Sequence, residues 1–239
     1  MVDKPGRRKK TNRPWGKMGG VAVVAVLVLL LVYFVIYPDY IYVPPPVYAK
    51  IGTSLGYIYA ELYPSCAPKT VNNFVSLANQ GFYNNLVWHR IVPGFVIQTG
   101  DPNTRNGVNS TRSTWGSGGS NQTVPLEWCG SLHNYAGYFG MARQGNQTTG
   151  LDSGTSQFYI ILRNDTTNEL ALDGYYTVFG KVISGMSVVC AIAKVKTLQA
   201  APNLPASEPA NPVFMKNVTM ISAAAAPTPQ PITQCPAGT

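Results

Sequence analysis

The sequence predicts a mainly β domain, built as a closed or nearly closed antiparallel sheet with helices packed over its openings. Short apolar or alternating segments recur from residue 47 to residue 221, which is typical of strands. Two other segments show the period of an amphipathic helix, and no internal repeat is present. Hydrophobic residues make up 45% of the 239 positions, so the chain can form a buried core.

The first 17 residues hold most of the positive charge of the chain. They contain seven Lys and Arg against one Asp, a net charge of +6, whereas the other 222 residues have 11 against 9, a net charge of +2. A basic arm directly before an apolar segment favours a topology signal that contacts anionic lipid. We therefore expect residues 1–17 to be a cytoplasmic arm and expect no nucleic-acid partner, although a basic DNA-associated protein is an alternative.

Residues 18–38 carry no charge and consist mainly of Val, Leu, Ala and Ile. About 20 helical residues span the hydrocarbon core of a bilayer, so this segment predicts one transmembrane helix. A cleaved secretory signal is the alternative, but its apolar region is typically about 7–15 residues, and this one is longer and ends in an aromatic belt. The arm then places all residues after Asp39 outside the cytoplasm.

The elements of the domain follow in order. Residues 39–46 form a stiff Pro-rich spacer. Two strands over 49–53 and 57–62 follow, separated by a turn at Gly56, and then one helix from Pro68 to before Gly81, because Pro suits a first helical turn and Gly suits the position after the last.

The second half of the chain predicts further strands and one more helix. Residues 103–123 are rich in Gly, Ser, Thr and Asn and indicate a surface loop, and 186–194 indicates the helix. Residues 223–239 are expected to be a disordered tail. The predicted strands are 138–142, 158–162, 177–182 and 213–221.

Four cysteines and five glycosylation sequons favour an exported protein. No CxxC pair indicates zinc or a redox motif, so the cysteines suit an oxidising compartment, with three disulfide pairings possible. The possible glycosylation sites are Asn109, Asn121, Asn146, Asn164 and Asn217.

The segment from Trp88 to Asp101 is the best candidate for a functional site. It brings Arg90, Phe95 and Gln98 together around a Pro-Gly turn, and an apolar wall with a few polar donors is how small ligand sites are built. Other catalytic patterns are missing from the sequence: it has two histidines without metal-ligand spacing, no Gly-x-Ser-x-Gly elbow and no phosphate-binding loop of the Walker type.

This segment resembles the cyclophilins, the peptidyl-prolyl cis/trans isomerases, and most resembles their prokaryotic members. The similarity covers residues 47–222 and implies an eight-stranded antiparallel barrel capped by two helices. Further motifs in the order of the family are Thr53-Ser-Leu-Gly56, Glu61-Leu-Tyr-Pro64, Ala67-Pro-Lys-Thr-Val71, Gly81-Phe-Tyr-Asn84, Gly140-Met-Ala-Arg143, Thr155-Ser-Gln-Phe-Tyr159 and Leu172-Asp-Gly174.

The resemblance implies a role for each matching residue. Arg90 stands at the position of the catalytic arginine, and Gln98 matches the glutamine that holds the substrate carbonyl. The substrate-binding groove would comprise Phe95, Val96, Ala142, Arg143, Gln157, Tyr159, Leu172 and Tyr176. The substrate would be a proline-containing polypeptide, no metal or other cofactor would be needed, and we expect a monomer.

The implied reaction explains the choice of arginine. Rotation about an X-Pro bond is opposed by partial double-bond character, with a barrier of about 18–20 kcal/mol. In the twisted transition state the prolyl nitrogen gains a lone pair, and a guanidinium donor stabilises that state over either planar one. We expect an isomerase that assists folding of exported proteins; the alternative is a scaffold that binds proline segments without turnover.

The sequence departs from the usual family pattern at three positions. Arg143 replaces a groove asparagine and Tyr176 replaces a histidine, and both are substitutions that prokaryotic-like members carry. Ala171 replaces a tryptophan associated with cyclosporin binding, so we expect weak affinity for that drug.

Overall fold

The computed structural model describes residues 23, 25–29, 43–198 and 207–236, apart from the side chains of 109–111 and 168–170. The chain divides into two compact units, 1–43 and 44–239. The described residues of the first unit are helical except Val43, and no helix in the described part of the chain is long and apolar enough to cross a membrane. The predicted arm, most of the predicted 18–38 helix and residues 39–42 of the spacer lie outside the described residues.

The second unit is built on one antiparallel sheet, as the alternating segments predicted. Within the described residues the sheet has nine strands in the order β3-β9-β1-β2-β8-β6-β7-β5-β4. The strands are β1 (Val47–Thr53), β2 (Gly56–Leu62), β3 (Leu86–Val87), β4 (Arg90–Val92), β5 (Val96–Thr99), β6 (Tyr138–Met141), β7 (Phe158–Ile161), β8 (Val178–Ser184) and β9 (Phe214–Ile221).

The expected number of eight strands was wrong, and the reason lies at Trp88 and His89. These two residues interrupt the segment 86–92, so β3 pairs with β9 and β4 pairs with β5. Since β3 and β4 are the two edges of the sheet and only two residues separate them, the sheet curves so that its edges come close to each other. The Trp88 amide donates to the Val213 carbonyl at 2.9 Å, outside the regular ladder.

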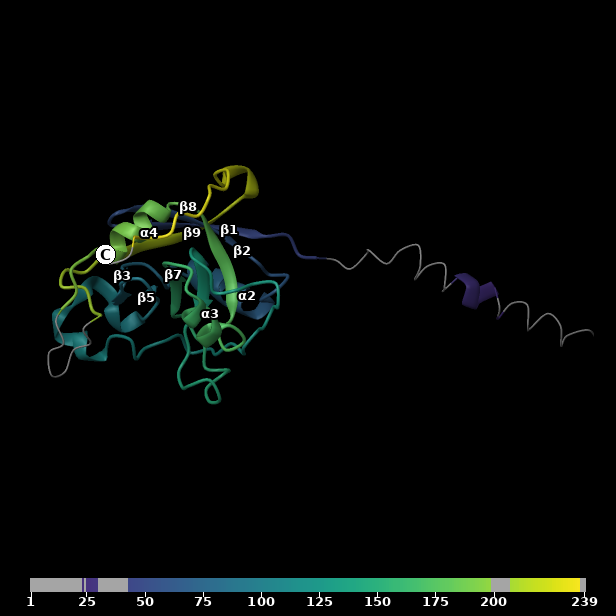
Figure 1. The fold of residues 1–239 in the computed structure, drawn as a ribbon, viewed down its shortest axis with the longest axis horizontal. Helices are drawn as coiled ribbons and strands as arrows, with labels where there is room; N and C mark the ends of the chain where they lie inside the picture. The colour runs from purple at the N-terminus through teal and green to yellow at the C-terminus, as the bar shows by residue number, and fades with distance from the viewer. Residues whose placement is uncertain (1–22, 24, 30–42, 199–206, 237–239) are drawn as a thin grey trace, which may run out of the picture. The chain divides into compact units, whose positions relative to one another are not determined.

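Helices α2 (Pro68–Asn79) and α4 (Met186–Ala193) confirm the two predicted helices, with bounds that agree to within one residue. Both helices turn their apolar faces to the core. Helix α2 packs against β9, whereas α4 packs against β2, β4 and β5 (Figure 1). A third helix, α3 (Thr166–Leu172), was not predicted. It is too short to show a clear period, although Asp165 caps it by accepting from the Thr167 amide at 2.9 Å.

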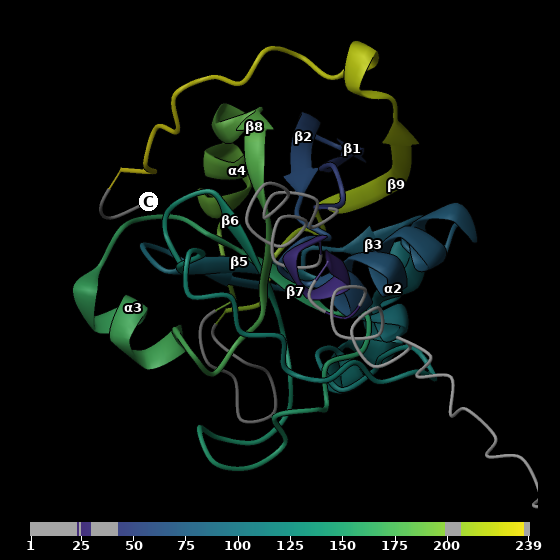
Figure 2. The same ribbon diagram turned by 90° about the vertical axis from the view of Figure 1, so that its right-hand side faces the viewer.

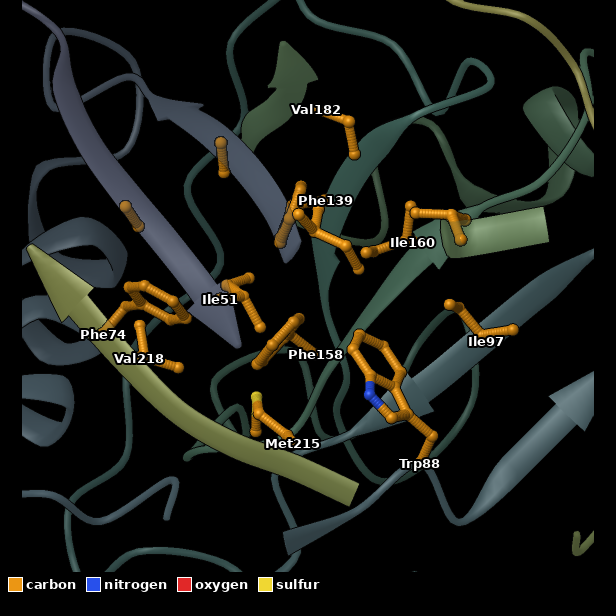
Figure 3. Packing of buried hydrophobic residues seen from close by; sticks show 14 of the residues in the cluster. Ile51, Phe74, Trp88, Ile97, Phe139, Phe158, Ile160, Val182, Met215 and Val218 are labelled. Carbon is orange, nitrogen blue, oxygen red and sulfur yellow. The ribbon is translucent and has the colours of Figure 1, made fainter. Parts of the chain in front are cut away.

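The core fills the inner face of the sheet with aromatic rings (Figure 3). Phe158 on β7 lies at its centre, with the ring centroids of Phe74 and Phe139 at 5.5 and 5.6 Å. Ile91, Ile97 and other residues that alternate with outward-facing positions complete this face. The outward positions of the same strands therefore remain for a second, separate cluster of side chains.

Two disulfides cross-link segments of the domain that are far apart in the sequence. Cys66 pairs with Cys129, and Cys190 on α4 pairs with Cys235. The loop predicted at 103–123 contains two short 3₁₀ helices, η1 (Pro102–Gly107) and η2 (Asn109–Thr114).

The C-terminal segment 223–236 has defined contacts, so the expectation of a disordered tail was wrong for these residues. It begins with the 3₁₀ turn η3 (Ala223–Ala225) and runs back past β8 and α4 (Figure 2). The amide of Gln230 donates to the Ile183 carbonyl at 2.8 Å, and the amide of the buried Cys235 donates to the Leu162 carbonyl at 3.0 Å. Such long-range contacts leave no local pattern in a Pro/Ala-rich sequence.

Candidate active site

The candidate site lies on the outer face of the sheet, across four neighbouring strands. Arg90 on β4 pairs with Gln98 on β5, Gln98 pairs with Tyr159 on β7, and Tyr159 pairs with Gly140 on β6. Residues directly opposite each other in antiparallel strands point to the same face, so these four positions form one transverse row. The register of the sheet therefore brings Arg90, Gln98 and Tyr159 together.

Glycine at position 140 gives the tyrosine its place in the row. A Cβ atom at Gly140 would collide with Cζ and the hydroxyl oxygen of Tyr159. The tyrosine ring can thus lie against the strand, where it is 4% exposed. The motif around Gly140 was noticed in the sequence, but its role as space for a ring is visible only in the sheet.

A cavity of about 330 Å³ opens over this row. All nine residues that line it were among the predicted site residues. They are Arg90, Phe95, Val96, Gln98, Ala142, Arg143, Tyr159, Leu172 and Tyr176. Six of these residues belong to a small apolar cluster that is separate from the core: Phe95, Val96, Ala142, Tyr159, Leu172 and Tyr176.

Arg90 is the cation that faces the cavity from the strand side. Its Nη1 donates to Gln98 Oε1 at 3.2 Å, and its guanidinium carbon lies 5.9 Å from the centre of the Phe95 ring. Partial burial lowers the pKa of Arg90 from its usual value, with Tyr176 acting in the opposite direction. A partly desolvated guanidinium is a stronger hydrogen-bond donor than one in water, because fewer water molecules compete for its protons.

Gln157, the tenth predicted site residue, lies in a neighbouring smaller cavity. That cavity shares Gln98, Ala142 and Arg143 with the first. Gln157 Oε1 accepts from Gln98 Nε2 at 2.9 Å, and Gln157 Nε2 donates to the carbonyls of Gly116 and Gly118 at 2.9 and 2.6 Å. Gln157 thus connects the row to the loop that follows η2.

Asp101 holds that loop in place, a role that the sequence did not reveal. Its carboxylate is completely buried and accepts from the backbone amides of Asn103, Gly116 and Gly118. A buried carboxylate needs such donors to compensate its lost hydration. This part of the surface loop predicted at 103–123 is therefore fixed around an acidic side chain.

Arg143 lines both cavities, and its guanidinium group binds the backbone of the loop 144–149. Its Nε donates to the Tyr175 carbonyl at 2.7 Å, and Nη1 donates to the carbonyls of Gln144, Asn146 and Thr149. Its guanidinium carbon also lies 4.5 Å from the centre of the Tyr176 ring. Two of the departures from the family pattern thus contact each other.

The remaining predicted positions lie away from the cavity. The side chains of Asn121, Asn146, Asn164 and Asn217 belong to exposed residues, and the side chain of Asn109 is outside the described part. Among the described residues no group of three or more His, Cys, Asp or Glu lies close enough to hold a metal ion.

Comparisons with known proteins agree with this geometry. Residues 48–220 match the family model of the cyclophilin type peptidyl-prolyl cis-trans isomerases. The chain is 42% identical over 145 residues to peptidyl-prolyl cis-trans isomerase-like 1 of Aspergillus fumigatus, a match that spans 61% of this chain and 81% of the relative. It is also 42% identical over 127 residues to peptidyl-prolyl cis-trans isomerase B of Bacillus subtilis, spanning 53% and 76%.

Solved structures show the same fold. The structure of a cyclophilin type isomerase of Cryptosporidium parvum has a TM-score of 0.62 at 25% identity and covers 74% of this chain and 98% of that one. The same protein was also solved in the presence of the dipeptide Ala-Pro. Fungal and bacterial relatives are equally identical to this chain, so the comparisons do not support a specifically prokaryotic character. The chain belongs to the cyclophilin-type peptidyl-prolyl cis-trans isomerase family and is an enzyme of that class.

Proposed function

We propose that Arg90 catalyses rotation about the X-Pro bond by donating a hydrogen bond to the prolyl nitrogen of the twisted transition state. The observation that carries this proposal is the row in which Arg90 and Gln98 face a cavity beside Tyr159 that also has apolar walls. The planar amide nitrogen of either ground state is a poor acceptor, whereas the pyramidal nitrogen has a free lone pair. The donor therefore stabilises the transition state selectively.

In this proposal Gln98 holds the substrate carbonyl while the proline ring occupies the cavity. Gln98 Nε2 already donates to Gln157 Oε1, and Gln98 Oε1 accepts from Arg90, so its amide has a defined orientation. The cavity offers the ring the apolar surfaces of Phe95 and Tyr159. Arg90 then acts on the prolyl nitrogen and Gln98 on the substrate carbonyl, without a nucleophile or cofactor.

The test is Arg90→Ala in the full chain, with exchange of an Ala-Pro peptide followed by NMR. Losing a preorganised transition-state donor should reduce kcat/KM by about 100-fold to 1,000-fold. Arg105→Ala is a matched control, because Arg105 donates to the carbonyls of Asn84 and Phe82 and does not line the cavity. Full activity in Arg90→Ala would refute the proposed role, and peptide binding without any exchange in the wild type would favour a binding module instead.

We also propose that the enzyme acts on exported or surface proteins from the outer face of a membrane, to which residues 18–38 anchor it. Support comes from the uncharged segment 18–38 behind a basic arm, from the two disulfides and from the exposed sequons. Protease added to intact cells should release a fragment containing residues 47–222. Protection of this fragment until the cells are lysed would contradict the proposed location.

A further inference from the structure

The hydroxyl group of Tyr159 points away from the cavity that its ring lines. It donates to Oδ1 of Asn134 at 2.8 Å, and Asn134 is 1% exposed. Burial raises the pKa of Tyr159 well above its ordinary value, with nearby Tyr176 and Asp173 adding to the shift, so the hydroxyl keeps its proton. The tyrosine is therefore held at both ends, by the Gly140 backbone under its ring and by Asn134 at its hydroxyl.

Asp173 determines which way the Asn134 amide points. The Asp173 Oδ1 atom accepts from both the backbone amide and Nδ2 of Asn134, at 2.9 and 2.7 Å. A carboxylate can only accept, so it requires the NH₂ end of the amide and leaves the oxygen for Tyr159. Charge-assisted hydrogen bonds of this kind are stronger than neutral ones.

His133 completes the carboxylate's hydrogen bonds from the solvent side. Its Nδ1 lies 2.7 Å from Asp173 Oδ2, and the side chain of His133 is 37% exposed whereas that of Asp173 is 20% exposed. Asp173 directly follows Leu172, which lines the cavity. One carboxylate thus supports two walls of the cavity, Leu172 through the backbone and Tyr159 through Asn134.

We propose that Asn134, oriented by Asp173, is a positioning residue that fixes the Tyr159 ring and thereby determines how strictly the cavity selects the five-membered ring of proline. This inference rests on the proposed use of the cavity as the proline site. Buried polar groups that are fully hydrogen-bonded make the surrounding structure rigid and define one arrangement of side chains. If the Tyr159 ring is fixed, the cavity excludes a substrate ring larger than that of proline. If the Tyr159 ring is free to tilt, the cavity admits the larger substrate ring.

The test compares a prolyl peptide with the same peptide carrying pipecolic acid, whose ring has one more methylene. Kinetics are measured on the full chain for the wild type and for Asn134→Leu, which keeps the branched shape of the side chain but removes its hydrogen bonds to Tyr159 and Asp173. In Asn134→Leu we expect the kcat/KM of the prolyl peptide divided by that of the pipecolyl peptide to fall about fivefold, with kcat for the prolyl peptide changed less than twofold. Tyr135→Phe is the matched control, since Tyr135 is on the same loop and 38% exposed.

A ratio that stays within twofold of the wild type in folded Asn134→Leu would overturn the proposal. If that variant unfolds at the assay temperature, Tyr159→Phe keeps the ring and removes only its hydroxyl. It should lower the ratio about threefold, and an unchanged ratio would overturn the proposal equally. In the double variant the two effects should not add, because both substitutions remove the same contact. A wild type that accelerates neither peptide would refute the proposed function rather than this inference.

Discussion

The two sides of the cavity above Arg90, Gln98 and Tyr159 are held by different means. On one side Arg90 and Gln98 lie on paired strands, where the register of the ladder sets their positions. On the other side Leu172 and Tyr176 lie on a helix end and a loop, and their neighbour Asp173 is held by contacts with residues 133 and 134. The comparison indicates that the positions of Arg90 and Gln98 are set by the sheet itself, whereas the side formed by Leu172 and Tyr176 depends on side-chain contacts.

The largest effect expected from this comparison concerns the two disulfides. Cys66→Ser with Cys129→Ser should lower the free energy of unfolding by about 3–4 kcal/mol, because the cross-link closes a chain separation of 63 residues. Amide hydrogen exchange should then become faster in 127–134 than in β4 and β5, since Cys129 lies on the loop that leads to Asn134.

Cys190→Ser with Cys235→Ser is the matched control for that experiment. It removes a disulfide of similar separation, 45 residues, so the loss of stability should also be about 3–4 kcal/mol. Its cross-link joins α4 to the C-terminal segment, so exchange in 127–134 should be unaffected. Equal exchange rates in 127–134 in the two double variants would remove the distinction between the two sides.

A second effect, of the order of 3 kcal/mol, should appear on the strand side at low pH. Burial lowers the pKa of His89 to about 4, although Asp101 opposes the shift. Below about pH 6.5, the pKa of histidine in the unfolded chain, His89 binds a proton when the chain is unfolded but not when it is folded. The contribution of the neutral His89 to the free energy of unfolding is therefore fully present above about pH 6.5, falls towards pH 4 and then levels off.

Urea unfolding at pH 7, 5.5 and 4.5 measures this effect as the difference between the wild type and His89→Gln. Carboxylates remote from His89 that titrate in the same range contribute equally to both proteins and cancel in the difference, whereas the interaction of His89 with Asp101 is part of the measured effect. The free energy lost by the wild type between pH 7 and 4.5 should exceed that lost by the variant. Parallel curves would show that His89 has no depressed pKa.

The smallest effect should come from Gln157→Leu, which cuts the link between Gln98 and the loop of Gly116 and Gly118. Loss of these hydrogen bonds should reduce kcat/KM about tenfold while Arg90 remains in its strand. Gln80→Leu is the control, because the same substitution removes an exposed hydrogen bond to Ser76 on α2, and it should change kcat/KM less than twofold. Equal activity of both variants in peptide exchange would show that Gln98 needs no support from the loop.

Much of the fold could be predicted because its signals are local. Apolar or alternating segments located β1, β2, β6, β7, β8 and β9 to within two residues, and Pro68 with Gly81 bounded α2. The break of the segment 86–92, helix α3 and the packed C-terminal segment were missed. The break at Trp88 and the packed C-terminal segment depend on partners far away in the chain, Val213 for Trp88 and Leu162 for Cys235, whereas α3 is too short to show a clear period.

The sequence by itself determined the family and with it the class of reaction, because motifs such as the one around Arg90, Phe95 and Gln98 follow the order of the family. Only the tertiary structure decided how these residues are held. The row through Arg90, Gln98 and Tyr159 needs the register of four strands, and the link from Asp173 to Asn134 crosses 39 residues of chain. Hydrogen bonds form between groups that the fold brings within about 3 Å, a distance that no local pattern encodes.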